Sequence, residues 1–218
     1  MTVNVHRVDM GNIHPPTLEK WAELYCQIWK EPPWNEAHWT PEGVIQNISA
    51  ELARPGAEAL IAISEGEVVG FTWGYEVAPD DMTKIAGSSY INYIFRAADN
   101  QGQGIRMFYV DELGVGRLAR HHRLGEALSA ELIRTVRERH GINHFVLRTD
   151  KNAVPARYLY RKLGFLELCD VEDAQYKDRT YWILDTIACN REAFLNQSVP
   201  FGVEIQMVES GRRLVHRF

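Results

Sequence analysis

The chain has 218 residues, of which 45% are hydrophobic and 24% are charged, a balance typical of a globular protein with one substantial core. The formal net charge of −5 argues against nucleic acid as the main partner and is compatible with a cationic substrate. No apolar run approaches the roughly 20 residues that span a bilayer, so we expect no membrane partner.

The three cysteines, Cys26, Cys169 and Cys189, are widely spaced and form no C-x-x-C pair. This pattern argues against a disulfide framework and against a thiolate zinc site. Residues 1–16 also lack an apolar signal core. Together these features predict a protein of the reducing cytoplasm.

The first predicted elements are a strand and two helices. Loosely alternating valines predict the strand at residues 2–8. Apolar residues at helical spacing predict a helix that ends before Pro32 and Pro33, with Thr17 as its candidate cap. Thr40 followed by Pro41 is a typical start for the second helix, because proline is tolerated at the first helical position.

A predicted hairpin and an irregular stretch come next. Strands at residues 59–64 and 68–77 flank a tight turn at residues 65–67. Residues 78–104 carry clusters of glycine and aspartate, and we interpret them as a partly ordered insertion between strands.

The next segment is a strand, a basic loop and a helix. Residues 108–115 are rich in β-forming side chains, an arginine-rich turn follows, and Leu124, Leu128, Leu132 and Val136 then recur at helical spacing. Such a junction presents free backbone N–H groups at the positive end of a helix dipole. It predicts an anion site, and phosphate is the usual anion.

The remaining elements alternate between strands and helices. We expect the helix to end at Gly141 and a strand to follow at 143–149. The next helix has Asn152 as its N-cap and ends at Gly164. After it we expect a strand at 165–169, an acidic loop at 170–178 and an antiparallel strand at 180–187. The tail predicts a short helix at 190–197 and a hairpin of residues 203–208 and 213–218. We therefore expect a domain at 1–187 and a C-terminal extension at 188–218.

The central strand and loop resemble a known motif. The sequence YVDELGV at residues 109–115 is similar to the Y-[IL]-E-D-[LI]-x-V strand of the GNAT acetyltransferases. Val115, Arg120 and Gly125 fall at the spacing of the V-x-P-x-x-R-G-x-G-x-G motif that comes after this strand in the family.

Three positions of that motif differ from the family pattern. Arg117 replaces the proline, and His121 and Arg123 replace the first two glycines. The change at His121 is mild if the backbone there is helical. The Arg123 side chain would either crowd a bound pyrophosphate or give it a cationic contact.

A second stretch, NAVPARYLYRKLGF, is similar to the family pattern N-x-x-A-x-x-x-Y-x-x-x-G-F. Ala156, Tyr160, Gly164 and Phe165 match it in mutual spacing, and Asn152 lies one residue too early. Pattern alone predicts an α/β or α+β protein. The resemblance implies the GNAT fold, a mixed, twisted sheet with helices on both faces, over roughly the first 187 residues.

The resemblance also implies acetyl-CoA as co-substrate. Backbone groups of Leu113 and Val115 would hold the pantetheine arm, where strands splay in the family. The phosphate loop would be formed by Arg120, His121, His122, Arg123, Leu124, Gly125 and Glu126, with Asn152 as a further binding residue. The alternative is a basic surface loop that only caps a helix. No metal is expected, because adjacent histidines do not converge on one ion.

By the same resemblance, Tyr160 is the general acid that protonates the leaving thiolate of coenzyme A. The alternative is a core aromatic residue, since Tyr160 lies on the apolar face of its helix. The amine must lose a proton before it attacks, and the family uses a carboxylate on the central strand for this. Asp111 is the candidate base or substrate anchor, and Glu112 is either a second such carboxylate or a solvated, ion-paired one. Neighbouring strand residues face opposite sides, so both serve only if a bulge intervenes.

The acceptor pocket is predicted from aromatic and acidic side chains in two loops. In the family, the loop after the first helix and the last hairpin shape this pocket. Here those loops supply Trp34, Glu36, Trp39 and Asp173, which would attract a cation and stack on it. The alternative is a surface charge cluster beside a packing pair of tryptophans.

These inferences converge on an N-acetyltransferase that transfers the acetyl group of acetyl-CoA directly to a primary amine of a small molecule or peptide. Acidic loops leave aminoglycoside acetylation open as an alternative, and Arg123 leaves open a non-catalytic module that binds acyl-CoA. A third hypothesis is a homodimer in which the hairpin of the tail adds to the partner's sheet edge.

Overall fold

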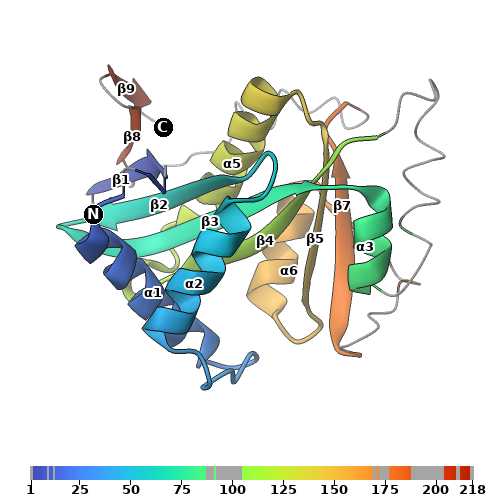
Figure 1. Cartoon of the computed structure of the whole chain (residues 1–218), viewed down its shortest axis with the longest axis horizontal. Coiled ribbons are helices and arrows are strands. Elements are labelled where there is room, and N and C mark those ends of the chain that lie inside the picture. The colour runs from blue at the N-terminus through green and yellow to red at the C-terminus, as the bar shows by residue number, and fades with distance from the viewer. Residues whose placement is uncertain are drawn as a thin grey trace.

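The structure, a computed structural model, describes residues 2–8, 10, 11, 13–86, 91, 105–168, 171 and 177–187, and the backbone of 204–209 and 212–216. In chain order the elements are β1 (Thr2–Arg7), α1 (Pro15–Trp29), α2 (Pro41–Leu52), β2 (Glu58–Ser64), β3 (Glu67–Val77), α3 (Pro79–Ala86), β4 (Met107–Val115), the 3₁₀ turn η1 (Arg117–Ala119), α5 (Leu124–His140), β5 (His144–Asp150), α6 (Val154–Lys162), β6 (Leu166–Leu168), β7 (Arg179–Asp185), β8 (Glu204–Glu209) and β9 (Arg212–His216) (Figure 1).

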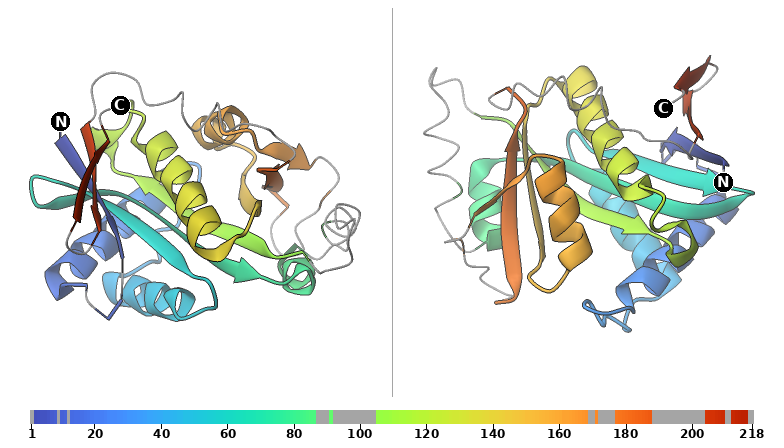
Figure 2. Two further views of the ribbon diagram at one scale, coloured as in Figure 1. Left: turned by 90° about the horizontal axis from the view of Figure 1, so that it is seen from above. Right: turned by 180° about the vertical axis from the view of Figure 1, so that it is seen from behind.

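The described strands form one mixed sheet in the order β6-β7-β5-β4-β3-β2-β1-β8-β9. The pairs β4–β5 and β1–β8 are parallel, and the other neighbours are antiparallel. Helices α1 and α2 cover one face of the sheet, and α5 and α6 cover the other (Figure 2). The predicted mixed sheet with helices on both faces is confirmed.

The periodic leucines of the central helix point into the larger core. Leu124, Leu128, Leu132 and Val136 of α5 are buried against β1, β2, β4 and β5. The helix ends at Gly141, whose left-handed φ of 67° terminates it as predicted. Packing against the sheet therefore fixes the start of α5 relative to the end of β4.

Aromatic side chains fill the space between the sheet and α1. Tyr25 stacks on Trp29, with ring centroids 4.3 Å apart, and both rings pack near Phe71 of β3. Trp73 lies edge-on to Trp21 at 5.3 Å. This packing sets α1 firmly across β3 and brings the polar edge of Tyr25 toward β4.

The first turns of α1, α2 and α6 each contain a proline, whereas only one of the three predicted polar caps is found. Helix α2 has the predicted cap, because the Thr40 hydroxyl accepts a hydrogen bond from Gly43 N at 3.2 Å. Helix α1, however, begins at Pro15 and not behind Thr17, and α6 begins at Val154 and not behind Asn152. Both corrections have one reason, since proline fits the first helical turn without losing a hydrogen bond.

Two further expectations concern the insertion and the tail. The predicted irregular stretch at 78–104 begins with a helix, α3, and residues 87–90 and 92–104 lie outside the described residues. In the tail, β8 and β9 pair as an antiparallel hairpin, and β8 pairs with β1 of its own chain. The helix expected at 190–197 lies outside the described residues, and a homodimer through this hairpin stays a prediction. In the described part of the chain, no helix has the length and apolarity to cross a membrane.

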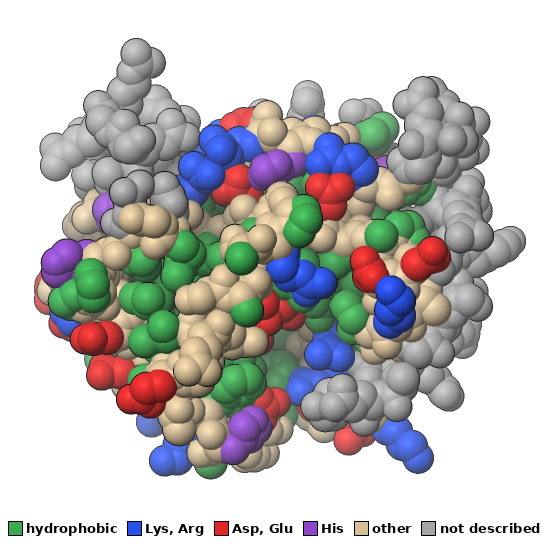
Figure 3. Space-filling model, in the orientation of Figure 1, with side chains coloured by type: hydrophobic (Ala, Val, Ile, Leu, Met, Phe, Trp, Pro, Cys, Tyr) green, Lys and Arg blue, Asp and Glu red, His purple; other side chains and the backbone are tan. Residues whose placement is uncertain are grey.

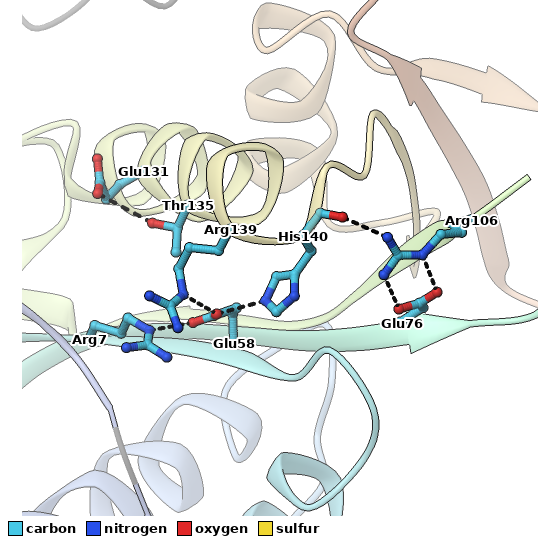
Figure 4. Close-up of polar contacts among 8 residues, drawn as sticks. All are labelled: Arg7, Glu58, Glu76, Arg106, Glu131, Thr135, Arg139 and His140. Carbon is cyan, nitrogen blue, oxygen red and sulfur yellow. Dashed lines mark hydrogen bonds and ion pairs between the residues drawn. The ribbon is translucent and has the colours of Figure 1, made fainter.

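A buried carboxylate joins the N-terminal strands to the end of α5 (Figure 4). Glu58 is 2% exposed and accepts hydrogen bonds from Arg7 Nε at 2.6 Å and Arg139 Nε at 2.9 Å. His140 Nε2 lies 2.8 Å from the same carboxylate. Burial acts to raise the pKa of Glu58, but the hydrogen bonds from these three side chains outweigh it and hold the pKa below its usual range.

We therefore predict that Glu58→Gln destabilises the protein by about 1.5–3 kcal/mol at pH 7, the range for hydrogen bonds to a charged group. Because the pKa of Glu58 is lowered on folding, this stability is present above the unfolded pKa of about 4.3 and is lost as pH falls through the folded value. Urea unfolding at pH 7 and below pH 4 measures both effects.

The matched control is Glu76→Gln, which breaks the more exposed pair with Arg106 (2.7 Å) drawn in the same view. It should cost less than about 1 kcal/mol. Equal losses for the two variants would show that the burial of Glu58 adds nothing.

Candidate active site

Strands β4 and β5 separate halfway along their length. They pair only from Met107–Val110 to His144–Leu147, although β4 continues to Val115 and β5 to Asp150. Beyond this point β4 keeps its hydrogen bonds to β3, and β5 keeps its own to β7. The backbone edge of β4 around Leu113 therefore faces a wedge instead of a neighbouring strand, as the resemblance to the family implies.

A β-bulge lies at the point where the two strands separate. Trp73 of β3 pairs with Glu112, but Gly74 pairs with Val110, so Asp111 is an extra residue in β4. A Cβ atom on Gly74 would lie 2.1 Å from the Tyr109 carbonyl oxygen, so this close approach requires glycine. The bulge overrides the strand alternation, and Asp111 and Glu112 line the same cavities.

Two cavities meet at this carboxyl pair. The smaller, about 210 Å³, lies in the wedge and is lined by Leu113, Thr149 and Tyr160 among others. The larger, about 450 Å³, opens beside α2 and α3 and is lined by Glu51 and Tyr75 among others. Both share Tyr25, Trp39, Asp111, Glu112 and Arg148. Figure 3 shows the hollow on this face, with acidic and basic side chains gathered around it.

The carboxyl groups here have raised pKa values. Burial raises the pKa of Glu112 first, and the nearby charges of Asp111 and Glu51 raise it further. The Tyr25 hydroxyl donates a hydrogen bond to Glu112 at 3.0 Å. Burial also raises the pKa of Asp111, which lies within hydrogen-bonding reach of Tyr75 and Glu51. Raised pKa values in a cavity mark these carboxyls as candidates for proton transfer.

Glu51 belongs to the same group. Burial, followed by the charge of Asp111, raises the pKa of Glu51 to about 7, although the Trp73 and Asn47 side chains stabilise its charged form. Trp73 Nε1 and Asn47 Nδ2 donate to its two oxygens at 2.5 and 3.0 Å. The three carboxyls therefore share fewer than three negative charges near pH 7.

Tyr160 belongs both to the core and to the wall of the smaller cavity. Its ring packs in the core, with centroids 5.9 Å from Phe165 and 6.1 Å from Trp182, and the residue also lines the smaller cavity. Burial, and then the charge of Glu112, raises the pKa of the Tyr160 hydroxyl. The side chain is therefore held as a protonated donor at neutral pH.

The predicted phosphate loop begins after η1 and leads into α5. His121 and Arg123 both have left-handed backbones, with φ of 66° and 59°, so the condition under which the change to histidine would be mild is not met. The loop keeps the conformation that glycine adopts easily, although a side chain there costs roughly 1–2 kcal/mol. The first hydrogen bond of α5 runs from Ala127 N to the Arg123 carbonyl oxygen at 3.0 Å. The N–H groups of Leu124, Gly125 and Glu126 precede it and have no partner within the helix.

Side chains brace this loop from several sides. Arg120 donates to the Val115 carbonyl oxygen at 3.0 Å and to Glu31 at 2.6 Å, which ties the loop to β4 and to the end of α1. Arg123 donates to both carboxylate oxygens of Glu126, at 2.7 and 2.5 Å. His121 and His122 are exposed, and no group of three potential ligands for a metal ion is found among the described residues.

The predicted acceptor residues have mixed outcomes. Trp34, Glu36 and Trp39 all line the smaller cavity. Glu36 is not a free anion, because it accepts hydrogen bonds from Trp39 Nε1 at 2.8 Å and from Arg179 at 3.3 Å. Asp173 lies outside the described residues. Asn152 is exposed, lines neither cavity, and donates its backbone N–H to Asp150 at 2.7 Å.

Sequence reasoning missed several residues of the site. Tyr25 and Glu51 come from helices that the pattern predicts only as packing elements, and Tyr75 comes from β3. Thr149 is 2% exposed, and its hydroxyl has no hydrogen-bond partner in the described part of the chain. The helical spacing of Tyr25 is the only local sequence feature that points to one of these residues. The same spacing is expected of any residue that packs in the core, so it does not indicate a site residue.

Comparisons with known proteins agree with this geometry. A family model described as "Acetyltransferase (GNAT) family" matches residues 18–165. Curated proteins give no match. A GNAT acetyltransferase from Staphylococcus aureus Mu50 is 18% identical over 84% of this chain and 99% of its own, with a TM-score of 0.55.

Two other solved structures are similar to the same extent. An aminoglycoside 6′-acetyltransferase type Ii is 17% identical over 84% of this chain and 96% of its own, with a TM-score of 0.57. The PaiA N-acetyltransferase from Thermoplasma acidophilum, in complex with coenzyme A, is 13% identical over 85% and 99%, with a TM-score of 0.57. At these identities the likeness concerns the fold alone.

The electrostatics of the carboxyl group predict that Glu51 titrates near pH 7 and that Asp111→Asn lowers its pKa, because one negative neighbour is removed. Burial should still keep the value above the ordinary 4.3. Carbon-13 NMR of the glutamate carboxyls measures both values. A Glu51 pKa that does not move in Asp111→Asn would show that the two carboxyls are not coupled.

Proposed function

Because the chain belongs to the GNAT acetyltransferase family, as its motifs predict, we propose that it is an acetyl-CoA-dependent N-acetyltransferase. Its acceptor would be a primary amine of a small molecule or peptide. The observation that carries this proposal is the bulged carboxyl pair, Asp111 and Glu112, which lines the same small cavity as Tyr160. A proton acceptor and a proton donor are thus presented to one reacting centre.

The residues present fit acetyl-CoA. The N–H groups at the start of α5 suit its pyrophosphate, since a helix N-terminus favours anions. The unpaired edge of β4 at Leu113 suits the amides of its pantetheine arm. The buried hydroxyl of Thr149 lacks a partner among the described residues on the wall of the same cavity. When bound, the thioester supplies an acetyl group that is already activated for attack by an amine.

We assign the proton transfers to two side chains. The Glu112 carboxylate accepts one proton from the acceptor ammonium, and the freed amine nitrogen forms a bond to the acetyl carbonyl carbon. As the carbon–sulfur bond breaks, Tyr160, which its raised pKa keeps protonated, donates its proton to the sulfur. The nitrogen loses its second proton to solvent as the amide forms, and solvent returns a proton to Tyr160 after the thiol has left. The transfer is direct. Cys26 lines neither cavity, and Cys169 and Cys189 lie outside the described residues.

A cationic acceptor suits the larger cavity. Glu51, Asp111 and Glu112 line it together with the cationic side chains of Arg54, Lys84 and Arg148, and Tyr25, Trp39 and Tyr75 provide aromatic surface. An ammonium group gains from both, through charge and through cation–π contact. We therefore assign Asp111 and Glu51 to holding the acceptor, while Glu112, which acts on the pKa of Tyr160, takes the proton.

Two alternatives remain as secondary proposals. Aminoglycosides are polycationic and would suit the carboxyls, and one similar structure carries that activity in its name. The acidic loop at 170–178 that favours them in the sequence lies mostly outside the described residues. A non-catalytic acyl-CoA module rests on Arg123, whose guanidinium pairs with Glu126. Release of thiol from acetyl-CoA with a panel of amines separates an enzyme from such a module.

The central experiment is turnover of Tyr160→Phe in that thiol-release assay. We expect kcat to fall by about 10- to 100-fold, the range for loss of a general acid, with little change in acetyl-CoA affinity. The substitution removes only the hydroxyl and keeps the ring that packs on Phe165 and Trp182. Unchanged turnover would remove Tyr160 from the mechanism.

Glu112→Gln and Asp111→Asn should affect different kinetic constants. The loss of the base in Glu112→Gln should lower kcat by about 10²-fold or more. The loss of an anchoring charge in Asp111→Asn should mainly raise the KM for the amine, about tenfold. A pattern with the two effects exchanged would reverse the assignment of the carboxyls.

A further inference from the structure

The loop that precedes α5 depends on one ion-paired cluster. Glu126, in the first turn of α5, is 5% exposed and accepts two hydrogen bonds from the guanidinium of Arg123. Lys162, at the end of α6, donates a third at 2.7 Å. A buried carboxylate with three charge-assisted hydrogen bonds is well satisfied, so these contacts fix the position of both cations.

The backbone of Arg123 explains why such a cluster is needed. Arg123 stands at the N-cap of α5 with a left-handed φ of 59° and makes no capping hydrogen bond with its side chain. The family motif has glycine at this position, which adopts the conformation without strain. Without glycine, the loop would populate other conformations unless the arginine side chain were held.

The Glu126 carboxylate also lies at an unexpected place for a phosphate site. A negative charge in the first turn of a helix interacts well with the dipole, but it repels a bound anion. Arg123 and Lys162 together offset that charge. The two cations therefore reduce the repulsion between Glu126 and an anion bound at this end of the helix. The same ion pairs also orient the loop.

We propose that Glu126 is a positioning residue that takes over the role of the missing motif glycine: by holding the Arg123 guanidinium, it keeps the loop in the left-handed conformation that receives the phosphates of acetyl-CoA. This inference rests on the proposed function. It also assigns Arg123 a role that the sequence left open, because the side chain is held against the helix and the backbone contacts the ligand.

The proposal has a thermodynamic signature. Apparent affinity falls in proportion to the fraction of protein in the competent conformation. Loss of the Glu126 charge should lower this fraction when residue 123 is arginine and leave it unchanged when residue 123 is glycine. If Glu126 acted only through its charge, its removal would strengthen anion binding in both backgrounds. If the ion pair only stabilised the fold, affinity would not change in either.

The test is a double-mutant cycle, with acetyl-CoA binding measured by isothermal titration calorimetry on Glu126→Gln, Arg123→Gly, the double variant and the unmodified protein. We expect Glu126→Gln to bind about tenfold more weakly and Arg123→Gly to bind within about twofold of the unmodified protein. The double variant should match Arg123→Gly. Weaker binding by Glu126→Gln in both backgrounds, or in neither, would overturn the proposal.

A second pair of variants leaves Glu126 untouched and guards against misfolding of Glu126→Gln. Arg123→Ala removes the guanidinium without providing glycine, so its affinity should fall about tenfold, whereas that of Arg123→Gly should not. Equal losses for alanine and glycine would mean that the arginine side chain itself binds the phosphates, and the proposal would be wrong.

Glu131→Gln is the matched control, because Glu131 pairs with Arg134 on the same helix at the same spacing, away from the loop. It should leave acetyl-CoA affinity unchanged. A loss as large as that of Glu126→Gln would overturn the proposal, since any ion pair of α5 would then suffice. If the unmodified protein does not bind acetyl-CoA, the proposed function itself fails, and this first titration separates that failure from the others.

Discussion

The separation of β4 from β5 after Val110 is the constraint on which the site depends. Up to that residue the two strands share a parallel ladder, and beyond it each keeps only its other neighbour. The opening leaves backbone groups without a strand partner and creates the smaller cavity between the strands. Gly74 permits the bulge at the same level, and so turns two consecutive carboxyls toward that cavity. The geometry of the candidate site therefore depends on one local departure from regular strand pairing.

Placing three carboxyl groups close together is unfavourable, and contacts with the surrounding structure offset part of this free energy. Glu51, Asp111 and Glu112 lie partly buried near one another, which disfavours their charged forms. Hydrogen bonds from Tyr25 and Trp73 satisfy part of the group, and the aromatic packing of α1 holds Tyr25 in place. A cluster that gives up stability in this way is typical of a functional site, because it gains most when a cation or a proton arrives.

Much of the fold could be predicted from sequence because its signals are local. Periodic leucines define α5, Thr40 with Pro41 defines α2, and Gly141 ends α5 where expected. The bulge could not be predicted, since it depends on the register between β3 and β4 and not on the residues at Asp111 alone.

Some residues of the candidate site could likewise be predicted from the sequence, and others could not. Motif resemblance identifies Tyr160 and the carboxyls, whereas Glu51 reaches the cavity only through the packing of α2 on the sheet. The pairing of Arg123 with Glu126 is equally hidden in the sequence. Two spaced charges suggest a surface pair, and the role proposed for this pair rests on the left-handed backbone at Arg123, which the sequence does not show.

The most direct test of this account is a thermal melt of the purified protein with acetyl-CoA, with coenzyme A and, as a phosphate control, with ATP. A ligand at 100 times its dissociation constant adds roughly 2.7 kcal/mol, which for a chain of this size raises the Tm by roughly 5–10 °C. The account predicts such a rise with both coenzyme A species and none with ATP. No rise at millimolar acetyl-CoA, or an equal rise with ATP, would contradict it.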